Sequence, residues 1–267
     1  MCLILFAHQC RADLPLVLLA NRDEFLARPS APLAAWAEVP GVVGGRDLVA
    51  GGSWLGVGRD GRWAAVTNIR EGERIPPGGS SRGWLVRDYL RGTAAPGDFA
   101  SQLLLRGADY AGFNLLLGAV GEIWYVSNRT TAPARLPPGG YGLSNGRLDT
   151  PWPKVEGGKA ALSRLLQQPQ VAIEAGFRLL ADSTPAPDRQ LPETGVPLAW
   201  ERALSATFIV APGYAYGTRS SSVLLRAANG STWLAERTFN GGPARWHQSS
   251  LRLNAAARVA CWPPTAS

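Results

Sequence analysis

Two apolar runs separated by a short polar break open the chain and predict a β-hairpin. Residues 2–7 read Cys-Leu-Ile-Leu-Phe-Ala and residues 16–20 read Leu-Val-Leu-Leu-Ala. Runs that are short and apolar throughout are typical of strands covered on both faces. The second run ends in the polar residues 21–24, and strand pairing would bring these side chains beside Cys2.

The remaining pattern predicts six more strands and four helices, separated by segments rich in glycine and proline. The expected strands cover residues 62–67, 113–119, 123–127, 206–211, 221–225 and 232–238, and the expected helices cover residues 82–90, 98–106, 155–167 and 172–180. Ser80 or Ser81 is the expected cap of the first helix. Strands at both ends, helices in the middle and between strands, and no clear linker predict a layered α+β fold in one domain over residues 1–267.

The amino-acid composition indicates a globular protein and argues against nucleic-acid-binding and membrane-spanning proteins. The 267 residues are 46% hydrophobic and 18% charged, enough for a sizeable core. The net charge is +7, but the arginines are scattered and no nucleic-acid-binding signature is present, so we expect no nucleic-acid partner. A small anionic ligand is compatible with this charge. No apolar segment reaches 18 residues, so we expect no membrane span.

Cysteine usage points to a reducing compartment. Cys2, Cys10 and Cys261 are the three cysteines, and their spacing suits neither a disulfide framework nor a metal site. The first apolar run is too short for a signal peptide and lacks a basic leader. We therefore expect a cytoplasmic protein with reduced thiols and no metal.

Cys2 is the candidate nucleophile, because it follows Met1 directly. If Met1 is removed, Cys2 carries both a thiol and a terminal amine with a pKa of roughly 7.7–8.0. That amine can take the thiol proton, as in the pairing of a terminal threonine with its own amine. Arg22 would lower the thiol pKa, and Asp23 or Glu24 would hold the amine and the guanidinium. A buried strand cysteine beside surface charges is the alternative interpretation.

Three further polar residues, Asn68, Asn145 and Arg219, stand at the ends of apparent strands. An acyl-transfer site needs oxyanion donors as well as a nucleophile and a base, and asparagine amides serve as such donors. An arginine orients a nucleophile or holds a carboxylate. Each of these residues taken singly is more often structural, so only their combination with Cys2 indicates a site.

A series of short motifs runs through nearly the whole chain in order. The motifs cover residues 1–2, 19–25, 28–29, 44–47, 51–56, 67–70, 81–83, 112–116, 142–145, 148–154 and 216–221. Together they resemble the NRDE family, which is the family of transport and Golgi organization protein 2. Ser53 stands where that pattern has threonine, a change that keeps the hydroxyl.

The resemblance implies the four-layer αββα sandwich of N-terminal-nucleophile hydrolases. It also implies a remote likeness to the choloylglycine hydrolase and penicillin V acylase group, in which a terminal cysteine attacks an amide. The arginine and aspartate of that group are spaced differently from residues 22–24, so the acidic partner stays open. Carried over residue by residue, the likeness assigns Cys2 as nucleophile, Arg22 with Asp23 or Glu24 as its neighbours, Asn68 and Asn145 on the oxyanion side, and Arg219 after a later strand.

Two hypotheses about function follow, because the family has no settled reaction. The first is a cysteine amidohydrolase or acyl-transfer enzyme that acts on a small amide or acyl compound without a cofactor and reacts faster once Met1 is removed. The second is a binding or trafficking protein for haem or for an acyl-CoA or lipid ligand. His8 shares a strand face with Cys2 and can reach such a ligand, although no Cys-x-x-Cys-His motif occurs. The sequence determines neither the substrate nor the oligomeric state.

Overall fold

Two antiparallel sheets form the centre of the molecule in a computed structural model that describes residues 2–58, 60–71, 79–239 and 243–253, and the backbone of 259–261. The first sheet has the order β10 (Gly139–Leu143), β1 (Cys2–His8), β2 (Leu16–Phe25), β12 (Tyr216–Arg226), β13 (Thr232–Phe239), β14 (Trp246–Leu253) and β15 (Val259–Cys261), with β11 (Val210–Ala211) paired to β12. The second sheet has the order β3 (Ser30–Ala35), β4 (Val42–Asp47), β5 (Leu55–Gly58), β6 (Trp63–Asn68), β7 (Phe113–Ala119), β8 (Glu122–Ser127) and β9 (Ala134–Arg135).

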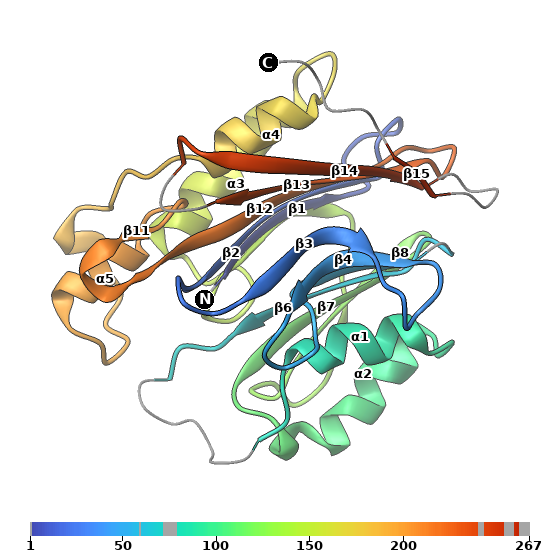
Figure 1. Ribbon diagram of the computed structural model, residues 1–267, viewed down its shortest axis with the longest axis horizontal. Helices are drawn as coiled ribbons and strands as arrows, with labels where there is room; N and C mark the ends of the chain where they lie inside the picture. Colours follow the sequence, from blue (N-terminus) through green and yellow to red (C-terminus); the bar gives the residue numbers. More distant parts are fainter. Residues whose placement is uncertain (1, 59, 72–78, 240–242, 254–258, 262–267) are drawn as a thin grey trace.

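Helices cover the outer face of each sheet, which gives four layers (Figure 1). The pair α3 (Pro153–Leu166) and α4 (Ile173–Leu180) packs on the first sheet, and the pair α1 (Gly83–Arg91) and α2 (Pro96–Leu105) packs on the second. A fifth helix, α5 (Leu198–Leu204), lies beyond one end of the sheets. The expected αββα sandwich of N-terminal-nucleophile hydrolases is therefore the observed architecture.

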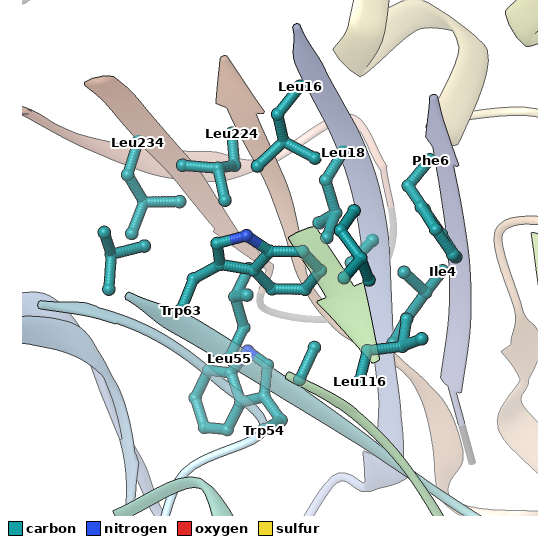
Figure 2. Packing of buried hydrophobic residues seen from close by; sticks show 14 of the residues in the cluster. Ile4, Phe6, Leu16, Leu18, Trp54, Leu55, Trp63, Leu116, Leu224 and Leu234 are labelled. Carbon is teal, nitrogen blue, oxygen red and sulfur yellow. The ribbon is translucent and has the colours of Figure 1, made fainter. Parts of the chain in front are cut away.

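Alternation along β1 and β2 explains why both strands are apolar throughout. Leu3 and Leu5 face α3 and α4, whereas Ile4 and Phe6 face the space between the sheets. Figure 2 shows the resulting inter-sheet core, in which Trp63 packs among leucines from both sheets. Each strand thus buries both of its faces, as its composition predicts.

Most predicted elements are confirmed. The hairpin pairs β1 with β2 in a register that places Cys2 opposite Arg22. The four predicted helices correspond to α1, α2, α3 and α4, with ends that move by at most two residues. The strands predicted at residues 62–67, 113–119, 123–127, 221–225 and 232–238 are also present, as β6, β7, β8, β12 and β13.

Two local predictions are wrong. Over residues 206–211 only Val210 and Ala211 form a strand, because the preceding backbone groups bind partners outside the sheet ladder: the Thr207 carbonyl accepts a hydrogen bond from Asn21, and the Phe208 amide donates to the Asp182 carbonyl. Neither Ser80 nor Ser81 caps α1 with its side chain, since the first turn is closed by backbone bonds instead. The missed elements are short, glycine-rich or exposed on one face, namely β3, β4, β5, β9, β10, β14, β15 and α5.

The register of the first sheet places two rows of inward-facing side chains at opposite ends of the sandwich. Cys2, Arg22 and Ser220 form one row across β1, β2 and β12. His8 and Arg226 stand in the other row. Because β1 has seven residues and a strand rises about 3.3 Å per residue, the rows lie roughly 20 Å apart.

Candidate active site

Cys2 is held at the start of an interior strand. The strand β1 pairs with β10 on one side and with β2 on the other. The Ser144 hydroxyl donates to the Cys2 carbonyl at 3.1 Å, and the Thr67 hydroxyl of the opposite sheet donates to the Ser144 carbonyl at 2.7 Å. The backbone of Cys2 is therefore tied to both sheets.

A cavity of about 270 Å³ opens in front of Cys2. Five of the seven predicted site residues line it, namely Cys2, Arg22, Asp23, Glu24 and Asn68. The cavity also contains side chains from the second sheet and from the start of α1, including Trp54 and Arg82. Close packing brings α1 to the site, since a side-chain carbon at Gly52 would come within 2.4 Å of the Gly83 backbone.

Arg22 presents a buried positive charge beside Cys2. Its side chain is 6% exposed, and its guanidinium carbon lies 4.4 Å from the centroid of a Trp54 ring. Its Nη1 atom has no hydrogen-bond partner within the described part of the chain. An arginine stacked on an aromatic face with a free N–H is able to donate to an anion that enters the cavity.

Asp23 lies behind Cys2, on the opposite face of β2 from Arg22. The side chain is 1% exposed and accepts a hydrogen bond from the Thr218 hydroxyl at 2.7 Å. Burial raises the pKa of Asp23, while the charges of Lys154 and Arg22 act in the opposite direction. Buried charge partners of this kind are typical of functional sites.

Glu24 belongs to a different group at the cavity rim. Its carboxylate accepts a hydrogen bond from the Phe25 amide at 2.9 Å and lies 3.8 Å from the Arg28 guanidinium. Arg28 in turn forms a 2.6 Å ion pair with Asp47. Of the two carboxylates left open by the sequence, Asp23 is the buried one and Glu24 is the one that is already engaged with a surface arginine.

The thiol of Cys2 is not activated by its surroundings alone. Burial raises the pKa of Cys2, and the charge of Asp23 acts in the same direction, whereas a hydrogen bond from the backbone N–H of Asp23 and the Arg22 charge lower it to a smaller extent. Since the thiolate is the nucleophilic form, the thiol needs a proton acceptor in addition to Arg22.

The two candidate asparagines have different surroundings. Asn68 lines the cavity, and its side chain makes no hydrogen bond with any residue that the structure describes. Asn145 is 1% exposed, and its side-chain amide donates to the Asn68 carbonyl at 2.8 Å. Asn68 is thus available to a ligand, and Asn145 holds it in place.

Arg219 does not line the Cys2 cavity, and unlike Asn145 it contacts no cavity-lining asparagine. The pairing of β12 with β2 shifts register between Thr218 and Ser220, so that Arg219 is the extra residue of a β-bulge. Its guanidinium donates to the carbonyls of Phe25, Leu26 and Arg28 at 2.8–3.2 Å. It is not among the residues that line the Cys2 cavity.

His8 does share a strand face with Cys2, but it stands in the row at the other end of the sheet. His8 therefore lies away from the Cys2 cavity, because strand alternation sets the face and not the position along the strand. That His8 reaches a ligand stays a prediction. Within the described residues no group of three or more His, Cys, Asp or Glu side chains is placed to hold a metal. No described helix is long and apolar enough to cross a membrane.

Sequence reasoning missed three charged side chains around the site, of which two are buried and Arg82 is half-buried. Lys154, in the first turn of α3, is 4% exposed, and burial lowers its pKa to about 8. Arg82 lines the cavity, and burial lowers its pKa. Glu236 lies between the sheets, accepts a hydrogen bond from the Leu33 amide at 2.8 Å, and has a pKa that burial raises to about 7. For Lys154 the only signal in the sequence was that lysine is rare, since Lys154 is one of only two lysines in the chain.

Comparisons with known proteins agree with this geometry. The chain has the fold of N-terminal-nucleophile hydrolases: a Caenorhabditis elegans ortholog of N-acylethanolamine-hydrolyzing acid amidase superposes with a TM-score of 0.50 over 84% of this chain and 92% of that chain, at 11% identity. The family profile described as Transport and Golgi organisation 2 matches residues 1–241, and the chain belongs to that family.

Curated relatives match along almost their whole length. The transport and Golgi organization protein 2 homolog of Bos taurus is 32% identical, over 94% of this chain and 98% of the relative. The Homo sapiens homolog is 31% identical, over 90% of this chain and 93% of the relative. The Drosophila melanogaster transport and Golgi organization protein 2 is 29% identical over the same shares.

Proposed function

We propose that the chain is a cysteine amidohydrolase or acyl transferase that uses Cys2 as an N-terminal nucleophile on a small amide or acyl compound. The observation that carries this proposal is the arrangement of Cys2 at the start of an interior strand, facing a cavity, with the Arg22 guanidinium opposite and the Asp23 carboxylate behind. A nucleophile in this place, on a fold shared with N-terminal-nucleophile hydrolases, supports acyl transfer over other reactions.

The steps follow from the chemistry of a terminal cysteine. After removal of Met1, the α-amine of Cys2 takes the thiol proton, and the sulfur attacks the carbonyl carbon of the amide. The Asn68 side chain donates to the oxygen that becomes negative, and Arg22 adds a positive charge nearby. The leaving nitrogen receives the proton from the Cys2 ammonium, which leaves a thioester. Water then attacks the thioester, releases the carboxylic acid and restores the thiol.

Asp23 has a supporting part in this scheme. Its carboxylate is buried, with Thr218 on one side and the Lys154 charge near it, so it is well placed to orient the ammonium that forms on Cys2. A buried carboxylate stabilises a nearby cation more strongly than an exposed one does. Lys154 in turn favours the ionised form of Asp23.

The test is covalent labelling followed by intact-mass measurement. Protein that begins at Cys2 is incubated with iodoacetamide or with an activated acyl ester, and the site of the adduct is mapped. Cys10 is exposed and serves as an internal reference thiol. We expect Cys2 to be labelled at least about tenfold faster than Cys10 and Cys261, and Cys2→Ala to remove the fast adduct. Slow and equal labelling of all three thiols would refute the proposal and favour the binding or trafficking hypothesis.

A further inference from the structure

A second cavity, of about 340 Å³, lies at the end of the inter-sheet space that is remote from Cys2. Its floor is one row of side chains in register across five strands of the first sheet. The row consists of His8, Leu16, Arg226, Thr232 and Leu253. Its roof comes from the second sheet, where Trp63 and the turn at Gly121 face the row. The volume falls within the range of small-molecule sites, roughly 300–1,000 Å³.

Arg226 brings a buried cation to this cavity, and no described carboxylate forms an ion pair with it. It is 7% exposed, and its hydrogen bonds with described residues go to neutral acceptors, the Thr232 hydroxyl at 3.2 Å and the Gly61 carbonyl. Asp60 also lines the cavity, but it is exposed to solvent and therefore screened. A buried charge is costly to leave unpaired, so the interior of the cavity favours an anion.

His8 adds a second polar side chain to the cavity. Its side chain is 5% exposed and lines the cavity, yet the imidazole makes no hydrogen bond with any residue in the described part of the chain. Burial lowers the pKa of His8, and the neighbouring positive charge of Arg135 acts in the same direction. A neutral imidazole offers one donor and one acceptor. Because no described residue takes them up, both groups are available to a molecule in the cavity.

We propose that this cavity binds a small organic monocarboxylate. The carboxylate meets Arg226, and a compact apolar body lies against Trp63, Leu16 and Ile123, with the His8 imidazole beside it. One arginine in a mostly apolar chamber suits one carboxylate, because a doubly charged group such as a phosphate monoester would need further cations. The site is independent of the Cys2 chemistry, since the two rows stand roughly 20 Å apart along β1 and β2.

The test compares phenylacetate with phenylacetamide, which has nearly the same shape and no charge. Binding to the full chain is measured by isothermal titration calorimetry at pH 7.5. We expect phenylacetate to bind at least about tenfold more tightly, since a hydrogen bond to a charged group contributes more than one between neutral groups. Arg226→Gln is expected to reduce this preference to less than about threefold. Arg252→Gln is the matched control and is expected to keep the preference, because Arg252 lies on β14, two strands from Arg226, and its side chain stacks on Trp233.

Two more variants locate the bound acid and guard against misfolding. Arg22→Met changes the other end of the inter-sheet space and is expected to leave phenylacetate binding intact. His8→Phe removes no hydrogen bond with a described residue and is expected to keep the fold. It takes away the polar contact and is expected to weaken phenylacetate binding by about threefold to tenfold. This variant decides the matter if Arg226→Gln does not fold. Equal binding of the acid and the amide, loss of binding in Arg22→Met instead of Arg226→Gln, or unchanged binding in His8→Phe would each overturn the proposal.

Discussion

The two ends of the inter-sheet space use one buried arginine each and surround it differently. Arg22 lies beside Cys2 and stacks on Trp54, and its Nη1 atom bonds to none of the described residues. Arg226 lies beside no nucleophile, and its neighbours are a histidine, a threonine and apolar side chains. The first end therefore combines a positive charge with a reactive thiol, and the second combines one with an apolar chamber.

The two ends also differ in how the sheets are joined. At the Cys2 end, hydrogen bonds cross between the sheets from Thr67 to Ser144 and from Leu33 to Glu236. At the His8 end, the cross-links of Gln9 and Arg226 reach only turn carbonyls, those of Gly121 and Gly61. Rigid side-chain positions suit chemistry, which tolerates little misplacement, whereas a binding chamber between turns has less need of them. The Cys2 end of the sandwich thus holds its side chains in fixed positions, whereas the His8 end encloses a chamber between turns.

The largest expected effect concerns Glu236, one of the buried groups that cross-link the Cys2 end. Its pKa is raised to about 7 in the folded chain, against a reference value of 4.5. The unfolded chain therefore releases this proton at lower pH than the folded chain does. The resulting stabilisation is complete below pH 4.5 and is lost as the pH rises through 7, by about 3 kcal/mol in total.

Glu236→Gln tests this directly, because glutamine keeps an oxygen for the Leu33 amide and an N–H for the Ser222 hydroxyl. Urea unfolding of both proteins at pH 5, 6, 7 and 8 gives the free energies. We expect the variant to gain stability relative to the parent by up to about 3 kcal/mol between pH 5 and pH 8. A constant difference across this range would show that Glu236 does not titrate there, and that the Cys2 end is less tightly closed than the geometry implies.

The next effect separates the two arginines. Arg22→Met is expected to lower the rate of Cys2 acylation about a hundredfold, since loss of one electrostatic contact to a developing anion typically costs 10²–10³ in rate. Folding stability is expected to change little, because methionine fills similar space without a buried charge. Arg46→Met is the matched control: Arg46 also stacks on a tryptophan, 4.5 Å from the Trp36 ring centroid, but does not line the cavity. A decrease of less than threefold in the acylation rate of Arg22→Met would mean that Arg22 does not stabilise the developing negative charge.

The third effect concerns Met1, which lies outside the described residues. Protein that begins at Cys2 is expected to react with an acyl donor at least about tenfold faster than a form that keeps Met1, because only the processed form has a proton acceptor on Cys2 itself. The raised pKa of the Cys2 thiol strengthens this expectation. Paired preparations, checked by mass and assayed side by side, give the ratio. Equal rates would mean that the amine is not the base.

The sequence predicted the parts of the site that depend on local pattern. A continuous apolar run identifies β1 and β2, and their hairpin places Arg22 opposite Cys2. It did not predict contacts that depend on how distant layers meet. Lys154 is buried next to Asp23 only because α3 packs on the outer face of the first sheet. The row from His8 to Arg226 depends on a strand register set more than 200 residues apart, which no local pattern encodes.

The smallest expected effect concerns Arg219. The family resemblance assigned this residue to the site, but it lies in the β-bulge of β12 and points away from the Cys2 cavity. In Arg219→Met we expect the Cys2 acylation rate to change less than threefold, because the guanidinium binds the carbonyls of Phe25, Leu26 and Arg28 and does not line the cavity. The loss of these bonds is expected to lower the free energy of unfolding by about 1 kcal/mol, the usual net value of a hydrogen bond at a partly exposed position. Urea unfolding and the labelling assay on one preparation separate the two quantities. A hundredfold loss of rate with unchanged stability would mean that Arg219 contacts the reacting atoms. The Cys2 end would then use two arginines, whereas the His8 end uses one.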